Sequence, residues 1–300
     1  MRYLKIMITL LVSCLCMEPR AKQSESSIDL QDNGNILSLG DLSFRVSSEK
    51  GGRIVSFKLG DKELLTTDSV DSRYYGASYW ISPQSVYWPP YPNVDQWPYK
   101  LEIDGKKLRL LSQPDSIHGL FVTKEFSVSK KDTAILINYT VKNRSQLTKK
   151  LAPWDVVRVH GGLSFFPVGE ISDINKSTIE DAYEEHGMIW FPFSENENEK
   201  GQKLFSTARG GWMAHYYKGL LFVKCFPDID LDEIPPGQGE AEIYVAPKGR
   251  YLELESHGKY TELQSGRSLQ YKQKWFLKDV GYKTKSELIA IIERLDKHID

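Results

Sequence analysis

Short segments in which apolar and polar residues alternate recur along most of the chain, and turn residues separate them. A period of two is the pattern of a β-strand with one buried face, and segments of about four to nine residues have the usual strand length. We predict strands at 42–46, 53–59, 100–103, 108–111, 121–128, 134–141, 220–226, 241–245, 251–255 and 269–277. The pattern therefore predicts an all-β sandwich of antiparallel strands.

A helical pattern occurs near the end of the chain. Thr284 and Glu287 have the spacing of a capping box, and Leu288, Ile291 and Leu295 then fall on one stripe. We predict a helix over 284–298 that packs on the outside of the β-sandwich. No repeat or linker interrupts the preceding strands, so residues 36–300 are predicted to form a single domain.

Residues 74–99 contain nine aromatic residues and five prolines within 26 positions. Proline removes a backbone donor and fixes φ, so this composition predicts a long ordered loop. Indole rings have flat apolar faces that suit the C–H face of a sugar, which makes Trp80, Trp88 and Trp97 candidate ligand-binding residues. The alternative is that the rings and prolines pack on each other as a lid without a ligand.

The N-terminus has the order of an export signal. Arg2 and Lys5 precede the apolar run 6–12, which is too short to span a bilayer. Residues 11–14 resemble a bacterial lipobox, so we expect residues 1–13 to be a lipoprotein signal peptide and Cys14 to become a lipid anchor. The alternative is an ordinary signal cleaved near Ala21. Either form predicts an exported, cell-envelope or periplasmic protein, which meets the membrane only through the anchor.

The polar composition of residues 14–35 predicts a flexible tether. In the folded body Cys225 is the single cysteine, which excludes a disulfide framework there and indicates a buried thiol in a strand.

The charges narrow the classes of partner. The chain has 39 Lys and Arg against 40 Asp and Glu, a net charge of -1, so we expect no nucleic-acid partner held by a basic field. No metal-binding motif and no phosphate loop occurs, so we predict neither a metal site nor a cofactor.

Several segments resemble the galactose mutarotase-like superfamily. They are the Gly-Gly-Arg-Ile opening of 51–57, the Glu-Leu-Leu at 63–65, and the segments 79–84, 152–158 and 251–258. The resemblance covers nearly all of residues 36–280 and points to a bacterial branch of the superfamily. It implies a β-supersandwich with a sugar-sized cleft on one concave sheet face.

We expect the cleft to take residues from the aromatic run and from the family-like segment 152–158. In addition to the three tryptophans, the candidate ligand-binding residues are Tyr79, Gln84, Trp154, Asp155 and Arg158. Arg158 suits paired sugar oxygens because its donors form a fork. The alternative for Arg158 is a structural ion pair with Asp155 or a neighbouring glutamate.

Mutarotase chemistry needs a base for the anomeric hydroxyl and an acid for the ring oxygen. The resemblance implies that a late-strand glutamate is the base. Glu253 and Glu255 lie two apart and share a strand face, where each would raise the other's pKa, and Glu255 is our first candidate. The alternative is a solvent-facing pair of carboxylates.

The acid in mutarotases is a histidine in an Asn-His pair, and the equivalent segment here, Trp154-Asp155, lacks one. His160, His118 and His257 are the candidates that remain. Three functions follow as hypotheses: an exported carbohydrate-binding protein, an aldose 1-epimerase-type isomerase, and a surface accessory protein of a polysaccharide-utilisation system whose rings bind another protein.

Overall fold

The computed structural model describes residues 25–31, 34–116, 118–169, 177–193 and 200–299. The predicted signal peptide 1–13 and the predicted anchor Cys14 lie outside these residues. Within the described part of the chain, no helix has the length and apolar character needed to cross a membrane.

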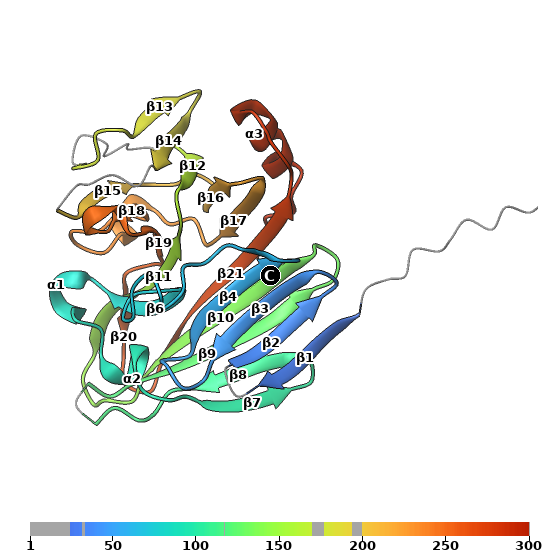
Figure 1. Cartoon of the computed structure of the whole chain (residues 1–300). Coiled ribbons are helices and arrows are strands. Elements are labelled where there is room, and N and C mark those ends of the chain that lie inside the picture. Colours follow the sequence, from blue (N-terminus) through green and yellow to red (C-terminus); the bar gives the residue numbers. More distant parts are fainter. Residues whose placement is uncertain (1–24, 32–33, 117, 170–176, 194–199, 300) are drawn as a thin grey trace, which may run out of the picture.

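Two large antiparallel sheets form the body of the protein (Figure 1). The first sheet has the order β1 (Ser26–Gln31), β2 (Gly34–Leu39), β3 (Leu42–Ser47), β4 (Arg53–Leu59), β6 (Ala77–Ser82), β11 (Lys149–Val159), β19 (Leu252–His257), β18 (Ala241–Val245), β15 (Gln202–Ser206), with β5 (Lys62–Glu63) beside β4 and β20 (Thr261–Leu263) beside β11.

The second sheet has the order β13 (Tyr183–Glu185), β14 (Met188–Phe193), β12 (Gly162–Pro167), β16 (Trp212–Tyr217), β17 (Leu220–Cys225), β21 (Ser268–Asp279), β10 (Ala134–Asn143), β9 (Leu120–Ser129), β8 (Lys107–Leu111), β7 (Lys100–Asp104). The predicted all-β sandwich of antiparallel strands is confirmed.

The core forms where the inward faces of the strands meet. On β10, Ile135, Ile137, Tyr139 and Val141 are all buried, as their alternation with polar residues predicts. Rings from both sheets pack in this interior, for example Trp275 and Phe57 with centroids 6.0 Å apart. Burial of apolar surface between the sheets therefore holds the sandwich together.

Helix α3 (Lys285–Glu293) is shorter than the predicted 284–298, but it begins at the predicted capping box. Leu288 and Ile292 are buried against apolar residues of the second sheet, so α3 covers part of that sheet's outer face (Figure 1). The remaining helical elements described are α1 (Gln84–Tyr87), α2 (Pro92–Asp95) and the 3₁₀ turns η2 (Leu231–Glu233) and η3 (Pro247–Gly249).

The flexible tether predicted for residues 14–35 is wrong where the structure describes it. Ser26–Gln31 form β1, which pairs along its whole length with β2 at one edge of the first sheet. Ile28 packs against the core, which gives this polar segment the apolar contact that its composition obscures.

The long loop predicted for residues 74–99 is also wrong in its first third. Ala77–Ser82 form the fully buried strand β6, paired with β11. The prolines of the segment begin at Pro83, so nothing in residues 77–82 prevents ladder pairing. Residues 74–76 and the part that follows Ser82 are irregular, and the latter contains the single turns α1 and α2.

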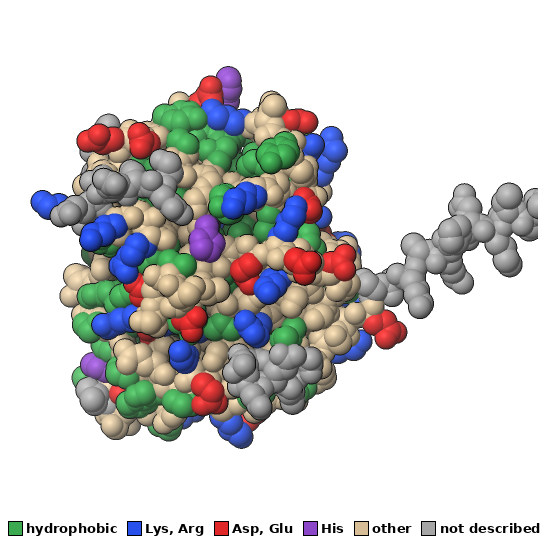
Figure 2. Space-filling model, viewed as in Figure 1, with side chains coloured by type: hydrophobic (Ala, Val, Ile, Leu, Met, Phe, Trp, Pro, Cys, Tyr) green, Lys and Arg blue, Asp and Glu red, His purple; other side chains and the backbone are tan. Residues whose placement is uncertain are grey.

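Basic and acidic side chains are intermixed on the face of the molecule shown in Figure 2, as the net charge of -1 suggests. Cys225 is buried and free, and burial raises the pKa of its thiol to about 12.

Candidate functional site

The site lies on the face of the first sheet that points away from the second sheet. Cross-strand pairing places Trp80 beside Trp154, and Trp154 beside His257, on adjacent strands β6, β11 and β19. Glu255 on β19 lies opposite Glu242 on β18. Because side chains alternate between faces, these residues project to one side of the sheet, while Tyr79 and Asp155 project into the core.

A pocket of about 350 Å³ opens on this face. Aromatic rings form most of its wall, and they are Tyr74, Trp80, Trp88, Trp154, Phe205, Tyr244 and Tyr251. Lys203, Glu253, Glu255 and Gln84 complete the lining. An aromatic wall with a few polar groups is typical of a small-molecule site.

The three tryptophans of the pocket pack edge to face rather than standing apart. Ring centroids are 5.0 Å apart for Trp80 and Trp154 and 5.1 Å apart for Trp80 and Trp88. Trp80 and Trp154 are almost fully buried, whereas 40% of Trp88 is exposed. Trp88 therefore offers the largest accessible indole surface of the three to a ligand.

The short α1 that precedes Trp88 is connected to β18 through Gln238. The backbone N–H of Gln84 donates to the side-chain oxygen of Gln238 at 2.9 Å, and the amide of Gln238 donates to Glu242 at 2.9 Å. These bonds connect the aromatic rim with the charged groups of β18.

Lys203 on β15 is the centre of a buried charged network. Its Nζ lies 2.6 Å from Glu242 Oε2 and 2.6 Å from Glu255 Oε1, and its side chain remains 19% exposed. Trp154 Nε1 donates to Glu255 Oε2 at 2.7 Å. The ammonium also lies 5.6 Å from the Trp154 ring centroid. The network thus joins the ring wall to two carboxyl groups that are fully buried.

Burial raises the pKa of Glu255 to about 8, and Glu242 and Glu253 add to this effect although Lys203 opposes it. Burial also acts to raise the pKa of Glu242, but Lys203 and His257 outweigh it and the pKa is lowered. The pKa values of the two carboxyls that share one ammonium therefore shift in opposite directions. Active sites use such a difference in pKa to assign one carboxyl as acid and the other as base.

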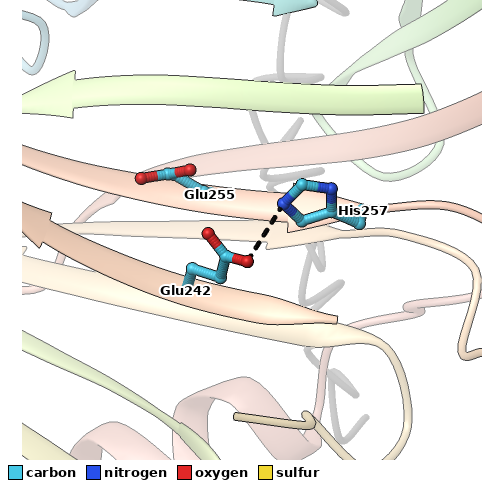
Figure 3. A group of neighbouring side chains, drawn as sticks. All are labelled: Glu242, Glu255 and His257. Carbon is cyan, nitrogen blue, oxygen red and sulfur yellow. Dashed lines mark ion pairs between the residues drawn. The ribbon is translucent and has the colours of Figure 1, made fainter. Parts of the chain in front are cut away.

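Figure 3 shows Glu242, Glu255 and His257 as neighbours, with the His257 ring facing Glu242, and one ligand atom from each lies within 4.8 Å of the others. His257 Nε2 is 3.3 Å from Glu242 Oε1, and its Nδ1 is 3.1 Å from Ser82 Oγ. Burial lowers the pKa of His257, so its ring is neutral at pH 7. Two carboxylates and an imidazole could hold a metal ion, but here the Lys203 ammonium supplies the positive charge between the carboxylates.

Arg158 lies fully buried beneath the ring wall. Its Nε is 2.7 Å from Glu253 Oε1, and its Nη1 donates to Ser78 Oγ at 3.2 Å. The guanidinium lies 5.0 Å from the Trp80 ring centroid. Of the two interpretations of Arg158 from the sequence, this contact matches the structural pair with a neighbouring glutamate.

The structure brings some of the candidate residues together. Trp80, Trp88, Trp154, Gln84, Glu253 and Glu255 all line the pocket. His257 lies directly under it, with its ring stacked 5.3 Å from that of Trp154.

Other candidate residues lie elsewhere. Asp155 pairs with Lys224 inside the sandwich at 2.7 Å, and the ring of Tyr79 lies there with its centroid 4.5 Å from that of Tyr139. Trp97 is 43% exposed and does not line the pocket, and His118 stacks on Tyr91. His160 does not line the pocket either, and within the described residues no histidine does.

Sequence reasoning did not find Lys203, Glu242, Tyr244, Phe205 or Tyr251. A signal existed for Glu242 and Tyr244, because they alternate with the apolar residues of a predicted strand. No local pattern could pair Lys203 with Glu255, which lies 52 positions away.

Comparison with known proteins gives the family and the fold. Residues 35–278 match the family described as Domain of unknown function (DUF4380), so the chain belongs to that family. A comparison with curated proteins finds no match.

Among solved structures, a TPR-domain containing protein from Parabacteroides distasonis is similar with a TM-score of 0.58 and 14% identity. The match covers 83% of this chain and 48% of that one, so the chain spans about half the length of that relative.

Two further structures match over their whole length. A galactose mutarotase related enzyme from Lactobacillus acidophilus has a TM-score of 0.54 and 9% identity, covering 87% of this chain and 100% of that chain. A galactose mutarotase-like protein from Lactobacillus casei has a TM-score of 0.52 and 10% identity, covering 85% of this chain and 100% of that chain. The fold is therefore galactose mutarotase-like, as the sequence resemblance implies. At these identities the likeness establishes the fold alone.

Proposed function

We propose that this protein is an exported carbohydrate-binding protein that holds a sugar in the aromatic pocket of the first sheet. The observation that carries the proposal is the composition of that pocket, in which ring faces adjoin two carboxyls and an ammonium. Rings can stack on the C–H face of a sugar, while Glu253, Glu255 and Lys203 supply acceptors and donors for its hydroxyls.

The test is isothermal titration of the purified protein with a panel of mono- and oligosaccharides. We expect heat of binding for at least one sugar and a strong loss of affinity in Trp88→Ala. Trp97→Ala is the matched control, because Trp97 is similarly exposed but does not line the pocket. No binding across the panel, or equal losses in both variants, would contradict the proposal.

A second candidate function is an aldose 1-epimerase-type isomerase. Glu253 and Glu255 both line the pocket, and the raised pKa of Glu255 suits a group that exchanges protons near neutral pH. Polarimetry of a freshly dissolved anomer would show faster equilibration with the wild-type protein and the loss of that rate in Glu255→Gln. An unchanged rate with the wild type would reject this activity but not sugar binding.

The third function, a surface accessory protein that uses its rings to bind another protein, has less support. Apart from Trp88, the pocket rings are mostly turned inward around a hollow rather than spread over a flat exposed surface.

We also propose that the chain is exported as a lipoprotein anchored through Cys14. Fractionation of cells should find the wild type with the membranes and Cys14→Ala in the soluble fraction. Equal distribution of the two would contradict the anchor.

A further inference from the structure

Arg53 belongs to the Gly-Gly-Arg segment at 51–53, and the pocket described above gives that segment no role. Its side chain is buried, and its Nη2 lies 3.2 Å from Asp95 Oδ1 in α2. Its Nη1 donates to the backbone oxygen of Arg73 at 2.7 Å. The guanidinium therefore joins α2 to the segment that leads into Tyr74, which lines the pocket.

Asp95 also holds a ring of the pocket. Trp80 Nε1 donates to Asp95 Oδ1 at 2.8 Å, so the indole and the guanidinium share one carboxylate oxygen. Asp95 is buried, and an N–H bond to a carboxylate is stronger than one to a neutral acceptor. Because Trp80 is attached to the backbone at one point and held at Nε1 at another, this bond limits the rotation of its ring.

The turn before Arg53 fits closely against α2. Gly51 has a φ of +62°, and a Cβ at this position would lie 2.1 Å from the backbone oxygen of Asp95. Its N–H donates to the backbone oxygen of Trp97 at 3.1 Å. Glycine allows both the positive φ and the close approach. The turn therefore contacts the backbone of the aromatic segment, while Arg53 contacts the side chain of Asp95.

Trp80 connects this anchor to the other rings of the pocket wall. Its ring centroid lies 5.1 Å from that of Trp88, 5.0 Å from that of Trp154 and 6.2 Å from that of Tyr74. Edge-to-face contacts set the angles between neighbouring rings, but the place of the whole cluster on the sheet needs anchors outside it. Trp154 has such an anchor in Glu255, and Trp80 has one in Asp95.

We propose that Arg53 and Asp95 are positioning residues for the pocket. The pair sets the place of Trp80 and of the segment that leads into Tyr74, and so the shape of the ring wall. Neither member of the pair lines the pocket, so each acts through the rings that do. The inference rests on the proposed sugar-binding function only for its effect on affinity.

The double variant Arg53→Met with Asp95→Leu separates positioning from stability. It removes both charges together, and replacing a buried ion pair with apolar side chains is often neutral for stability, whereas removing one partner is not. The N–H of Trp80 and the backbone oxygen of Arg73 still lose their partners. Urea denaturation should therefore find the double variant more stable than either single variant, while the ring wall stays displaced.

The indole N–H resonances of protein labelled with ¹⁵N-tryptophan report the rings without any ligand. Replacing each of the seven tryptophans with phenylalanine assigns them. In the double variant the Trp80 resonance should move upfield as its carboxylate acceptor is lost, and those of Trp88 and Trp154 should shift with it. The resonances of Trp190 and Trp212, in the second sheet, should stay in place. A change confined to Trp80 would overturn the proposal, because the pair would then hold one ring and not the wall.

Titration calorimetry with the sugar of the panel that the wild type binds most tightly measures the effect on affinity. We expect a loss of about tenfold in the double variant. The matched control is Lys274→Met with Asp132→Leu, which replaces a similarly buried ion pair of 2.8 Å in the second sheet and should bind as the wild type does. Equal affinities in the two double variants would overturn the assignment.

The two measurements separate this inference from the proposed function. If no sugar of the panel binds to the wild type, sugar binding fails, and the indole resonances still decide whether Arg53 and Asp95 position the rings. If a sugar binds and the resonances of Trp88 and Trp154 do not respond to the double variant, sugar binding stands and the positioning role is rejected.

Discussion

Two lysine–carboxylate clusters lie on opposite faces of the first sheet. On the core side, Lys224 reaches from β17 to Asp155 at 2.7 Å, and both side chains are fully buried. On the pocket side, Lys203 reaches Glu242 and Glu255 at 2.6 Å, but its side chain keeps 19% of its surface exposed. Asp155 and Trp154 are adjacent in sequence, so a single step along β11 separates the two environments.

The difference shows what makes a buried ion pair available for binding. The Lys224 pair is enclosed by Tyr139, which donates to Asp155 at 3.3 Å, and by the backbone of Leu254, which accepts from Lys224 at 3.2 Å. In the Lys203 cluster Trp154 also donates to Glu255, but Lys203 and Glu255 line the pocket. The first cluster can only join the two sheets, whereas the second can also exchange contacts with a ligand.

The largest expected effect is on the enclosed pair. Lys224→Met leaves the Asp155 carboxylate buried without its cation, and this should lower the free energy of unfolding by about 3–5 kcal/mol. Urea denaturation measures the change, and adding Asp155→Asn should recover part of it. A loss below about 1 kcal/mol would show that the pair is not sealed from water as described.

A smaller loss is expected on the pocket side. Lys203→Met leaves two carboxyls without their ammonium, but the pKa of Glu255 is raised, so this carboxyl can take up a proton, and the cluster opens on the pocket. We expect a decrease of about 1–3 kcal/mol in the free energy of unfolding. The matched variant Lys203→Met with Glu242→Gln should be more stable than the single variant. If Lys203→Met lowers the free energy of unfolding as much as Lys224→Met does, the two clusters do not differ in burial as we infer.

Removal of a ring should change binding more than stability. Trp88→Ala takes away the most exposed indole of the pocket and should weaken sugar binding about tenfold. Trp97→Ala, with similar exposure outside the pocket, should leave the affinity unchanged. Calorimetry of both variants beside thermal unfolding separates the two effects, and an equal affinity in the two variants would refute a role for the Trp88 ring.

The smallest expected effect is on the pH dependence of stability. The pKa of Glu255 is raised from 4.5 to about 8 in the folded state, so folding favours the proton. The resulting contribution to the free energy of unfolding is complete below pH 4.5 and is lost as the pH rises to about 8. Glu255→Gln should therefore unfold at a temperature that declines less between pH 5 and pH 8 than that of the wild type. A steeper decline in the variant would reverse the assigned direction.

The architecture could be predicted from the sequence because alternation along single strands reports burial directly. The same alternation could also have removed two wrong residues from the predicted site. Trp154 and Asp155 are neighbours on one strand, as are Tyr79 and Trp80, so only one member of each couple can face a ligand. The shared face of Glu253 and Glu255 follows from their spacing, and both line the pocket.

What could not be predicted depends on contacts between distant segments. Lys203 reaches Glu255 only because β15 and β19 both flank β18, and no local pattern specifies that order. The exposure of Trp88 and the burial of Trp80 likewise depend on the path of the chain through α1. The sequence therefore identified the rings, Glu253 and Glu255, but not Lys203 and Glu242, which join them in the charged network.

The order of strands in the first sheet has a consequence for how the protein is presented. β1 forms one end of the order, and three strands, β2, β3 and β4, separate it from β6, the first strand that contributes to the pocket. At about 4.8 Å between neighbours, some 19 Å of sheet lies between the two. If the chain is attached to a surface upstream of Ser26, the attachment lies at the β1 edge of the sheet, away from the strands that form the pocket. The pocket of an attached molecule would then stay accessible to ligands in solution.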